Sequence, residues 1–207
     1  MRSALPKANR RVTQAAETRA YIVATAGRLF DANGYVRTTI ESVATEAGVA
    51  LQTVYNSVGN KATLLSAVLD AAAAGPGTRQ VLELMQERTQ NAPDLDSLTV
   101  VLADWFVEVH QRTGRIMDVI SQAAAVDPDV AALEQHRALQ RLERYHKAAA
   151  AVRERGGLTS GMTVGEAAAA IWSLGHPQTF KALVGSSGWT VEAYRNWILR
   201  SLTAALA

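Results

Sequence analysis

Apolar residues recur along this chain at the three- and four-residue spacing of an α-helix, and this period limits the folds open to it. The clearest example is the set Leu98, Val101, Leu102, Trp105, Phe106 and Val109. Residues at this spacing form one stripe along a helix, which has to be buried against another element. The sequence holds no alternating apolar and polar runs joined by Asn-Gly or Asp-Gly turns, which would predict β-hairpins. We therefore expect an all-α fold.

Glycine, proline and capping residues divide this pattern into separate helices. Asn33-Gly34 ends a first helix, a capping box at Thr38–Glu41 begins a second, and Ala47-Gly48 ends it. The further helices are expected over about 50–56, 60–74, 78–90, 98–109, 115–125, 127–155 and 163–172, with a last one after Thr190. We expect His176-Pro177 to kink or split a helix, and 185–188 to form a turn.

Composition narrows the class of protein. The chain has 207 residues, 48% of them hydrophobic and 19% charged, which is typical of a globular protein with a sizeable core. It contains no cysteine, no apolar run long enough for a membrane span, and no apolar segment after its basic N-terminus. We expect a soluble, cytoplasmic protein without disulfides or zinc–thiolate sites.

Positive charge is concentrated in the first third of the chain. Residues 1–61 carry eight Lys or Arg against four acidic residues, whereas the rest of the chain is slightly acidic. A basic end on an acidic body indicates a polyanionic partner for that end alone.

The segment GVALQTVYNSVGNK, residues 48–61, is short, polar and almost uncharged. A helix, a glycine turn and a second short helix with a polar outer face are typical of a helix-turn-helix. Val49 and Val54 are expected to face inward, and the outward set is Leu51, Gln52, Thr53, Tyr55 and Asn56. Amide and hydroxyl groups of this kind can contact base edges or phosphates. An ordinary helical hairpin with a solvated polar face fits the same residues.

Residues 18–70 resemble the DNA-binding domain of the tetracycline-repressor (TetR) family of transcriptional regulators. The matching residues include Ala26, Leu29-Phe30, Gly34-Tyr35, Thr38, Val43-Ala44, Ala47-Gly48-Val49, Thr53-Val54-Tyr55, Lys61 and Leu64-Leu65. Three positions depart from the family pattern. Ala50 stands where Ser or Thr would cap the recognition helix, Val58 replaces a common Phe, and Asn56 replaces His or Tyr.

The resemblance implies a homodimeric, ligand-responsive regulator with an N-terminal three-helix helix-turn-helix domain and a C-terminal helical ligand-binding and dimerisation domain. The expected division is a flexible basic arm at 1–14, the DNA-binding domain at 15–59 and the effector domain at 60–207. The residues expected at operator DNA are Thr38, Thr39, Leu51, Gln52, Thr53, Tyr55, Asn56 and Lys61. Gln52 and Leu51 would contact bases, and Tyr55 and Lys61 would bind phosphates.

Aromatic and methionine residues of the C-terminal part are the candidates for an effector pocket. They are Trp105, Phe106, His110, Met117, Tyr145, Trp172 and His176. Pockets between helices are lined by such groups, and the lining favours an apolar or aromatic small molecule, although the same residues also fit a plain core. Tyr194 and Trp197 are assigned to packing or to the dimer interface.

Enzymatic chemistry has little support in the sequence. Glu143 and His146 form a single Glu-x-x-His pattern, whereas a di-iron bundle needs two such motifs and further glutamates. There is no nucleophile elbow, Walker loop or dinucleotide fingerprint. We expect no enzyme, metal or cofactor, but a repressor that binds a palindromic operator as a homodimer and is released by a small molecule. The rival hypothesis is a helical protein–protein interaction module without DNA function.

Overall fold

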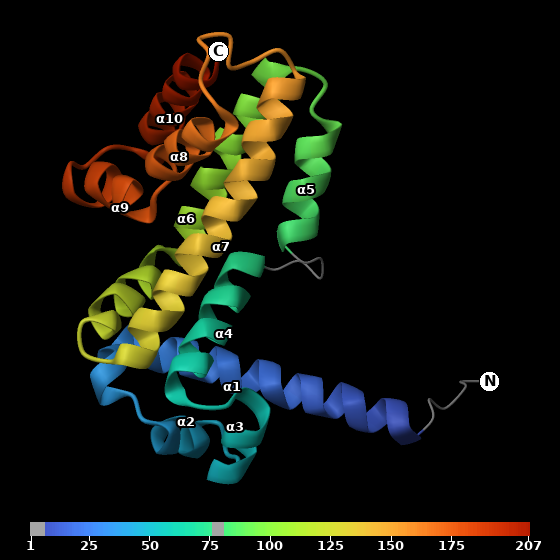
Figure 1. Ribbon diagram of the computed structural model, residues 1–207. Helices are drawn as coiled ribbons and strands as arrows, with labels where there is room; N and C mark the ends of the chain where they lie inside the picture. The colour runs from blue at the N-terminus through green and yellow to red at the C-terminus, as the bar shows by residue number, and fades with distance from the viewer. Residues whose placement is uncertain (1–6, 76–80) are drawn as a thin grey trace. The chain divides into compact units, whose positions relative to one another are not determined.

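The computed structural model describes residues 7–75 and 81–207, which form α-helices and one π-helical segment joined by short turns (Figure 1). No strand occurs in these two ranges, so the all-α prediction is confirmed. Within the same ranges no helix combines the length and hydropathy required to cross a membrane.

The helices fall into two compact units. In chain order they are α1 (Lys7–Arg37), α2 (Ile40–Glu46), α3 (Leu51–Val58), α4 (Lys61–Ala74), α5 (Val81–Asn91), α6 (Leu95–Ala124), α7 (Pro128–Glu154), α8 (Val164–Leu174), α9 (Pro177–Phe180), the π-helical segment (Lys181–Ser186) and α10 (Val191–Leu206). Unit 1 comprises the chain up to Ala72 together with Arg115–Glu134, and unit 2 comprises Ala73–Gly114 together with Gln135–Ala207. Helices α4, α6 and α7 therefore contribute residues to both units.

These units do not coincide with the division expected at residue 59, because α4 and parts of α6 and α7 share the core of unit 1. The expected flexible arm also differs from the structure, since α1 already begins at Lys7. Residues 1–6 of that arm and the start of the helix expected at 78–90 lie outside the described residues.

The core of unit 1 holds α1, α2 and α3 together. Each of these helices packs against the other two (Figure 1). The fully buried side chains at their centre include Ile22, Phe30, Val43 and Val54, with Leu64 and Leu65 added from α4. One face of the short helix α3 is thereby anchored, through Val54.

Glycines with positive φ set the turns on either side of α2. Gly34 interrupts α1 at φ 73°, and Gly48 separates α2 from α3 at φ 64°. An L side chain is strained in this region of conformational space. The sequence predicted a helix end at each of these glycines. Helix α2 ends before Gly48, whereas α1 continues to Arg37 with a non-helical residue at Gly34.

The capping box of α2 is one residue later than predicted. Thr39 is the N-cap, and its hydroxyl accepts the Ser42 N–H at 3.0 Å while the Thr39 N–H donates to Ser42 Oγ at 3.1 Å. Thr38 is buried instead, and its hydroxyl donates to the Gly34 and Leu29 carbonyls. The capping box predicted at Thr163–Glu166 and the caps predicted at Asn60, Asp127 and Thr190 are present.

Helix α6 is one continuous helix of 30 residues, although two helices were predicted over 98–109 and 115–125. Gly114 lies in helical conformation at the junction and does not end the helix. Glycine weakens a helix interior by only about 1 kcal/mol, which packing can offset. The prediction also differs at 185–188, where Gly185 belongs to the π-helical segment.

Unit 2 has a second core, in which α8 packs against α10. Its fully buried side chains include Leu98, Phe106, Ile171, Tyr194 and Ile198. Arg155, just after α7, donates to the carbonyls of Thr89 and Ala92 at the end of α5, at 3.0 and 2.8 Å. A cation at a helix C-terminus satisfies free carbonyls and complements the helix dipole.

In unit 1, contacts among Tyr35, Lys61 and Asp127 join the end of α1 to the starts of α4 and α7. The Tyr35 hydroxyl donates to Asp127 Oδ2 at 2.6 Å, and the Lys61 ammonium lies 3.9 Å from the centre of the Tyr35 ring. Asp127 Oδ1 also accepts the Asp129 N–H at 2.9 Å. The Tyr35 hydrogen bond lowers the pKa of Asp127, and burial followed by that bond raises the pKa of Tyr35.

We predict that Tyr35→Phe lowers the free energy of unfolding by about 1–2 kcal/mol at pH 7, because it removes a hydrogen bond to a carboxylate but keeps the ring. Urea unfolding measures this difference, and Tyr21→Phe, at a side chain that is 52% exposed, is the control. Asp127 has a depressed pKa in the folded chain, so its contribution is present above the unfolded pKa of about 3.9 and is lost as the pH falls through the folded value. An equal effect of Tyr35→Phe at pH 7 and below pH 3 would contradict this assignment.

Candidate nucleic-acid interface and effector site

The outer face of α3 is the first candidate site. Gln52, Tyr55 and Asn56 are exposed, and Leu51 and Tyr55 leave 39% and 44% of their surface accessible. Val54 and Val58, on the opposite face, are buried. The helix carries no charged residue, so its exposed face offers hydrogen-bonding groups and one apolar side chain.

The two amides on this face are paired with each other. Gln52 Nε2 donates to Asn56 Oδ1 at 2.9 Å, one helical turn away. This bond holds both side chains in a defined direction while Gln52 Oε1 and Asn56 Nδ2 have further hydrogen-bonding capacity. The pair was not foreseen from the sequence, although the spacing of four residues allows it.

The start of α3 has no side-chain cap. Ala50 is the N-cap residue and makes no side-chain hydrogen bond there, as its departure from the family pattern implied. Thr53, half-buried, donates its N–H to the Ala50 carbonyl at 2.8 Å. The other N–H groups of this first turn have no partner within the helix and form the positive end of its dipole, which favours anions.

The two other threonines expected at DNA, Thr38 and Thr39, differ in their exposure to solvent. Thr39 is exposed at the start of α2 with its hydroxyl in the capping box. The Thr38 side chain is only 1% exposed and bonded to backbone carbonyls, so we correct its assignment from DNA contact to the packing of the turn after α1.

The Lys61 ammonium group contacts the Tyr35 ring, and in this position its pKa is lowered. Burial lowers the pKa of its ammonium group, and the nearby Asp127 carboxylate opposes this effect.

Arg19 was missed by sequence reasoning. It is exposed on α1, and its Nε donates to the Ser57 carbonyl of α3 at 3.2 Å. No sequence signal pairs residues 38 positions apart.

The second candidate site is the aromatic cluster of unit 2. Phe106 stacks on His110 with ring centres 6.0 Å apart and meets Tyr145 edge-on at 5.9 Å. Trp172 and His176 are in edge contact at 5.1 Å, and Trp105 packs against the core of this unit. Six of the seven residues predicted for an effector pocket therefore lie in one unit.

Met117 is the exception and has to be removed from the predicted pocket. It belongs to unit 1 and packs against the core that holds α1 to α4. Helix α6 is continuous, so residues at its two ends serve different cores. Two aromatic residues outside the predicted pocket belong to the cluster instead. Phe180 lies 5.3 Å from His110 and 4.9 Å from Tyr194 between ring centres.

His110 is a neutral donor within this cluster. It is 5% exposed, and its Nε2 lies 3.1 Å from the Gly175 carbonyl, which can only accept a hydrogen bond. Burial lowers the pKa of His110 to about 4, so the ring is uncharged at neutral pH. A Cβ on Gly175 would lie 2.0 Å from Phe106 Cζ, so the Phe106 ring packs directly on the backbone there.

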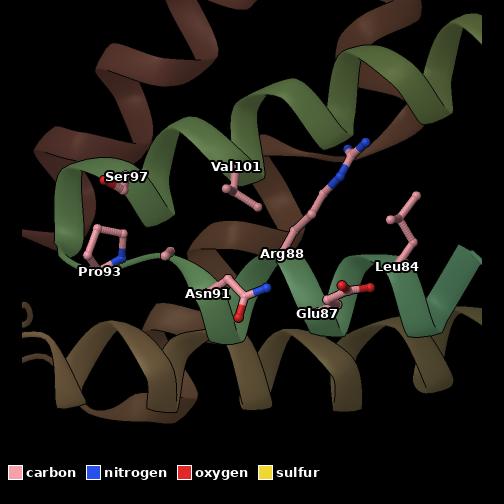
Figure 2. A pocket seen from close by; sticks show the side chains of 8 residues that line it. Leu84, Glu87, Arg88, Asn91, Pro93, Ser97 and Val101 are labelled. Atoms are coloured by element: carbon pink, nitrogen blue, oxygen red, sulfur yellow. The ribbon is translucent and has the colours of Figure 1, made fainter.

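A hollow on the surface of unit 2 lies elsewhere, between α5 and the start of α6 (Figure 2). It is open, and its lining is Leu84, Glu87, Arg88, Asn91, Ala92, Pro93, Ser97 and Val101. Arg88 is paired with Glu108 at 3.0 Å. None of the predicted effector residues lines this hollow.

Comparison with known proteins agrees with the architecture. Residues 22–68 match the sequence model of the family described as bacterial regulatory proteins, tetR family. The HTH-type transcriptional regulator TtgR of Pseudomonas putida is 31% identical over 126 residues, which cover 60% of this chain and 59% of TtgR. The matched region thus spans about three fifths of that relative.

Solved structures extend the likeness in fold to most of the chain. The structure of NalD, the secondary repressor of the MexAB-OprM multidrug efflux pump in Pseudomonas aeruginosa, superimposes with a TM-score of 0.72 at 22% identity and covers 93% of this chain and 98% of NalD. A complex of SmeT with triclosan superimposes with a TM-score of 0.71 at 23% identity and covers 92% of each chain. The match to the tetR family of bacterial regulatory proteins therefore covers the N-terminal helix-turn-helix region, residues 22–68, while the rest of the chain shares the fold of these solved structures.

Proposed function

We propose that the chain is a DNA-binding transcriptional repressor that binds a palindromic operator as a homodimer and is released by a small apolar or aromatic molecule. The observation that carries the proposal is the outer face of α3, where Leu51, Gln52, Tyr55 and Asn56 are exposed on a helix anchored by Val54. A helix of this size enters the major groove, where amides and apolar groups distinguish base pairs.

The groups around α3 supply the sequence-independent part of binding. Tyr55 belongs to the outer face of α3, Arg19 is exposed on α1 and contacts the Ser57 carbonyl of α3, and Lys61 begins the next helix. Hydroxyl and cationic groups bind phosphates and set the register of the protein on the duplex. Arg19 adds a positive charge at the C-terminal end of an otherwise uncharged helix.

The aromatic cluster of unit 2 is the proposed effector site. SmeT has a similar fold, and its solved structure is a complex with triclosan, which is an aromatic molecule. Helices α4, α6 and α7 each contain residues of both units, so a ligand that shifts them in unit 2 acts on backbone that continues into unit 1. By linkage, the ligand lowers DNA affinity by the same factor by which DNA lowers ligand affinity.

A helical interaction module is the second candidate, favoured by the lack of charge on α3. The two functions differ in their dependence on salt. DNA binding through phosphates weakens steeply as salt rises, whereas an apolar contact between helices does not.

We predict that Gln52→Ala weakens binding to the preferred operator by about 1–3 kcal/mol, because an amide that pairs with a base edge is lost. Random DNA of the same length should be affected far less. Fluorescence anisotropy measures both affinities, and Gln122→Ala, at an exposed glutamine of α6 in unit 1, is the control. Equal losses on operator and random DNA would contradict base contact by Gln52.

We predict that Lys61→Ala weakens all DNA sequences alike and lowers the slope of log affinity against log salt by about one phosphate contact. Lys61→Arg should restore the slope because it keeps the charge. If Lys61→Ala instead reduces the free energy of unfolding and leaves the salt slope unchanged, Lys61 acts only through its contact with Tyr35.

We predict a two-fold dimer, built from the last helices, that holds its two α3 helices about one DNA turn apart, roughly 34–36 Å or somewhat more. Helix α10 buries Tyr194, Ile198, Leu202 and Leu206 in its own unit, while Trp197 and Leu199 stay partly exposed. Light scattering at micromolar concentration should give twice the mass of 22.2 kDa. A monomeric mass would rule out the arrangement.

A further inference from the structure

We infer that the aromatic cluster of unit 2 takes a neutral molecule that carries a hydrogen-bond acceptor, with the Tyr194 hydroxyl as the donor to it. The inference rests on the proposed effector site and names the chemistry of its ligand. Two buried donors that find no partner among the described residues, and the uncharged groups around them, carry it.

Tyr194 is fully buried, and within residues 7–75 and 81–207 its hydroxyl has no hydrogen-bond partner. Buried polar groups are almost always paired, because an unpaired one loses its bonds to water without replacement. Phenylalanine would fill the same space without this penalty. The other buried side chains of α10 are aliphatic, so the Tyr194 hydroxyl is the one polar group among the buried side chains of this helix.

The Tyr194 ring lies at the centre of the cluster. Its ring centre is 4.9 Å from Phe180, 6.0 Å from Trp197 and 6.4 Å from His110. Burial raises the pKa of Tyr194, and the nearby Tyr145 phenol raises it further, so Tyr194 keeps its proton. The hydroxyl is therefore available as a donor at neutral pH.

Trp172 provides the second such donor. Its indole Nε1 is buried and has no partner in the described part of the chain, and its ring meets His176 at 5.1 Å. An indole N–H donates and cannot accept. Tyr194 and Trp172 belong to α10 and α8, which pack against each other in unit 2. A hydrogen-bond acceptor is the group that either side chain can bind.

The groups around the Tyr194 hydroxyl disfavour an anion. His110 is uncharged and donates its Nε2–H to Gly175, and burial raises the pKa of Tyr145 to about 12. For Tyr145 the cost of burying a charge exceeds the influence of Arg141, which acts in the direction of a lower pKa. A ketone, ether or amide oxygen on an apolar body fits donors in such surroundings, whereas burying the charge of a carboxylate among uncharged rings is costly.

A pair of probes with one shape tests the inference. Acetophenone and α-methylstyrene differ only in a C=O group that replaces a C=CH₂ group, so their shapes match and only the first carries an acceptor. Calorimetry gives the ratio of their affinities for the full-length chain and for Tyr194→Phe. Because one hydrogen bond is worth about tenfold in affinity, we expect the preference for acetophenone to fall about tenfold in the variant while α-methylstyrene binds unchanged.

Two further measurements separate ligand binding from packing. The melting temperature of the unliganded Tyr194→Phe variant should equal or exceed that of the parent chain, because the substitution removes an unpaired hydroxyl. Tyr21→Phe, at the exposed tyrosine of α1, should change neither the affinity ratio nor the melting temperature.

Three results would overturn the inference. A lower melting temperature of Tyr194→Phe would mean that the hydroxyl is already paired, for instance with a buried water. An unchanged affinity ratio would mean that the hydroxyl does not contact the ligand, while the effector site itself would stand. If neither acetophenone nor α-methylstyrene binds, the proposal that the cluster is an effector site fails as well.

Discussion

The burial of Val54 is the contact on which the proposed interface depends. Helix α3 has eight residues, and an isolated helix of that length is not stable in water. It forms because Val54 and Val58 are buried in the core that α1 and α2 complete. Since one face is held by this core, the other face can consist of uncharged amides and an aromatic ring that are exposed rather than packed. The stability of unit 1 and the availability of its polar face thus have one origin.

Helix boundaries were predictable where local chemistry sets them. The glycines Gly34 and Gly48 and the caps at Asn60 and Thr190 act within four residues, so the sequence contains the whole signal. Long-range packing decides the remainder. Gly114 lies inside α6 although glycine often ends helices, and the capping role expected of Thr38 falls to its neighbour because the turn after α1 buries Thr38.

In the candidate sites, too, the features set by local sequence were predictable and those set by long-range packing were not. The outward face of α3 follows from helical periodicity, but the Arg19 contact with Ser57 and the Tyr35 bond to Asp127 join segments far apart in the chain. The aromatic cluster was found by residue type alone, which cannot assign a residue to a core. Met117 lies on the same helix as Trp105 and Phe106 but in the other unit. Tyr194 was assigned to packing or to the dimer interface, although its hydroxyl has no partner among the described residues.

The most direct test of the central claim is the selection of bound fragments from genomic DNA, followed by footprinting of the recovered site. If the outer face of α3 contacts DNA bases, the selection returns one inverted repeat, and the protein protects two successive major grooves on one side of the duplex. The protection weakens steeply as the salt concentration rises. Recovery of no common sequence, or binding that is indifferent to salt, would contradict the claim and favour a helical interaction module.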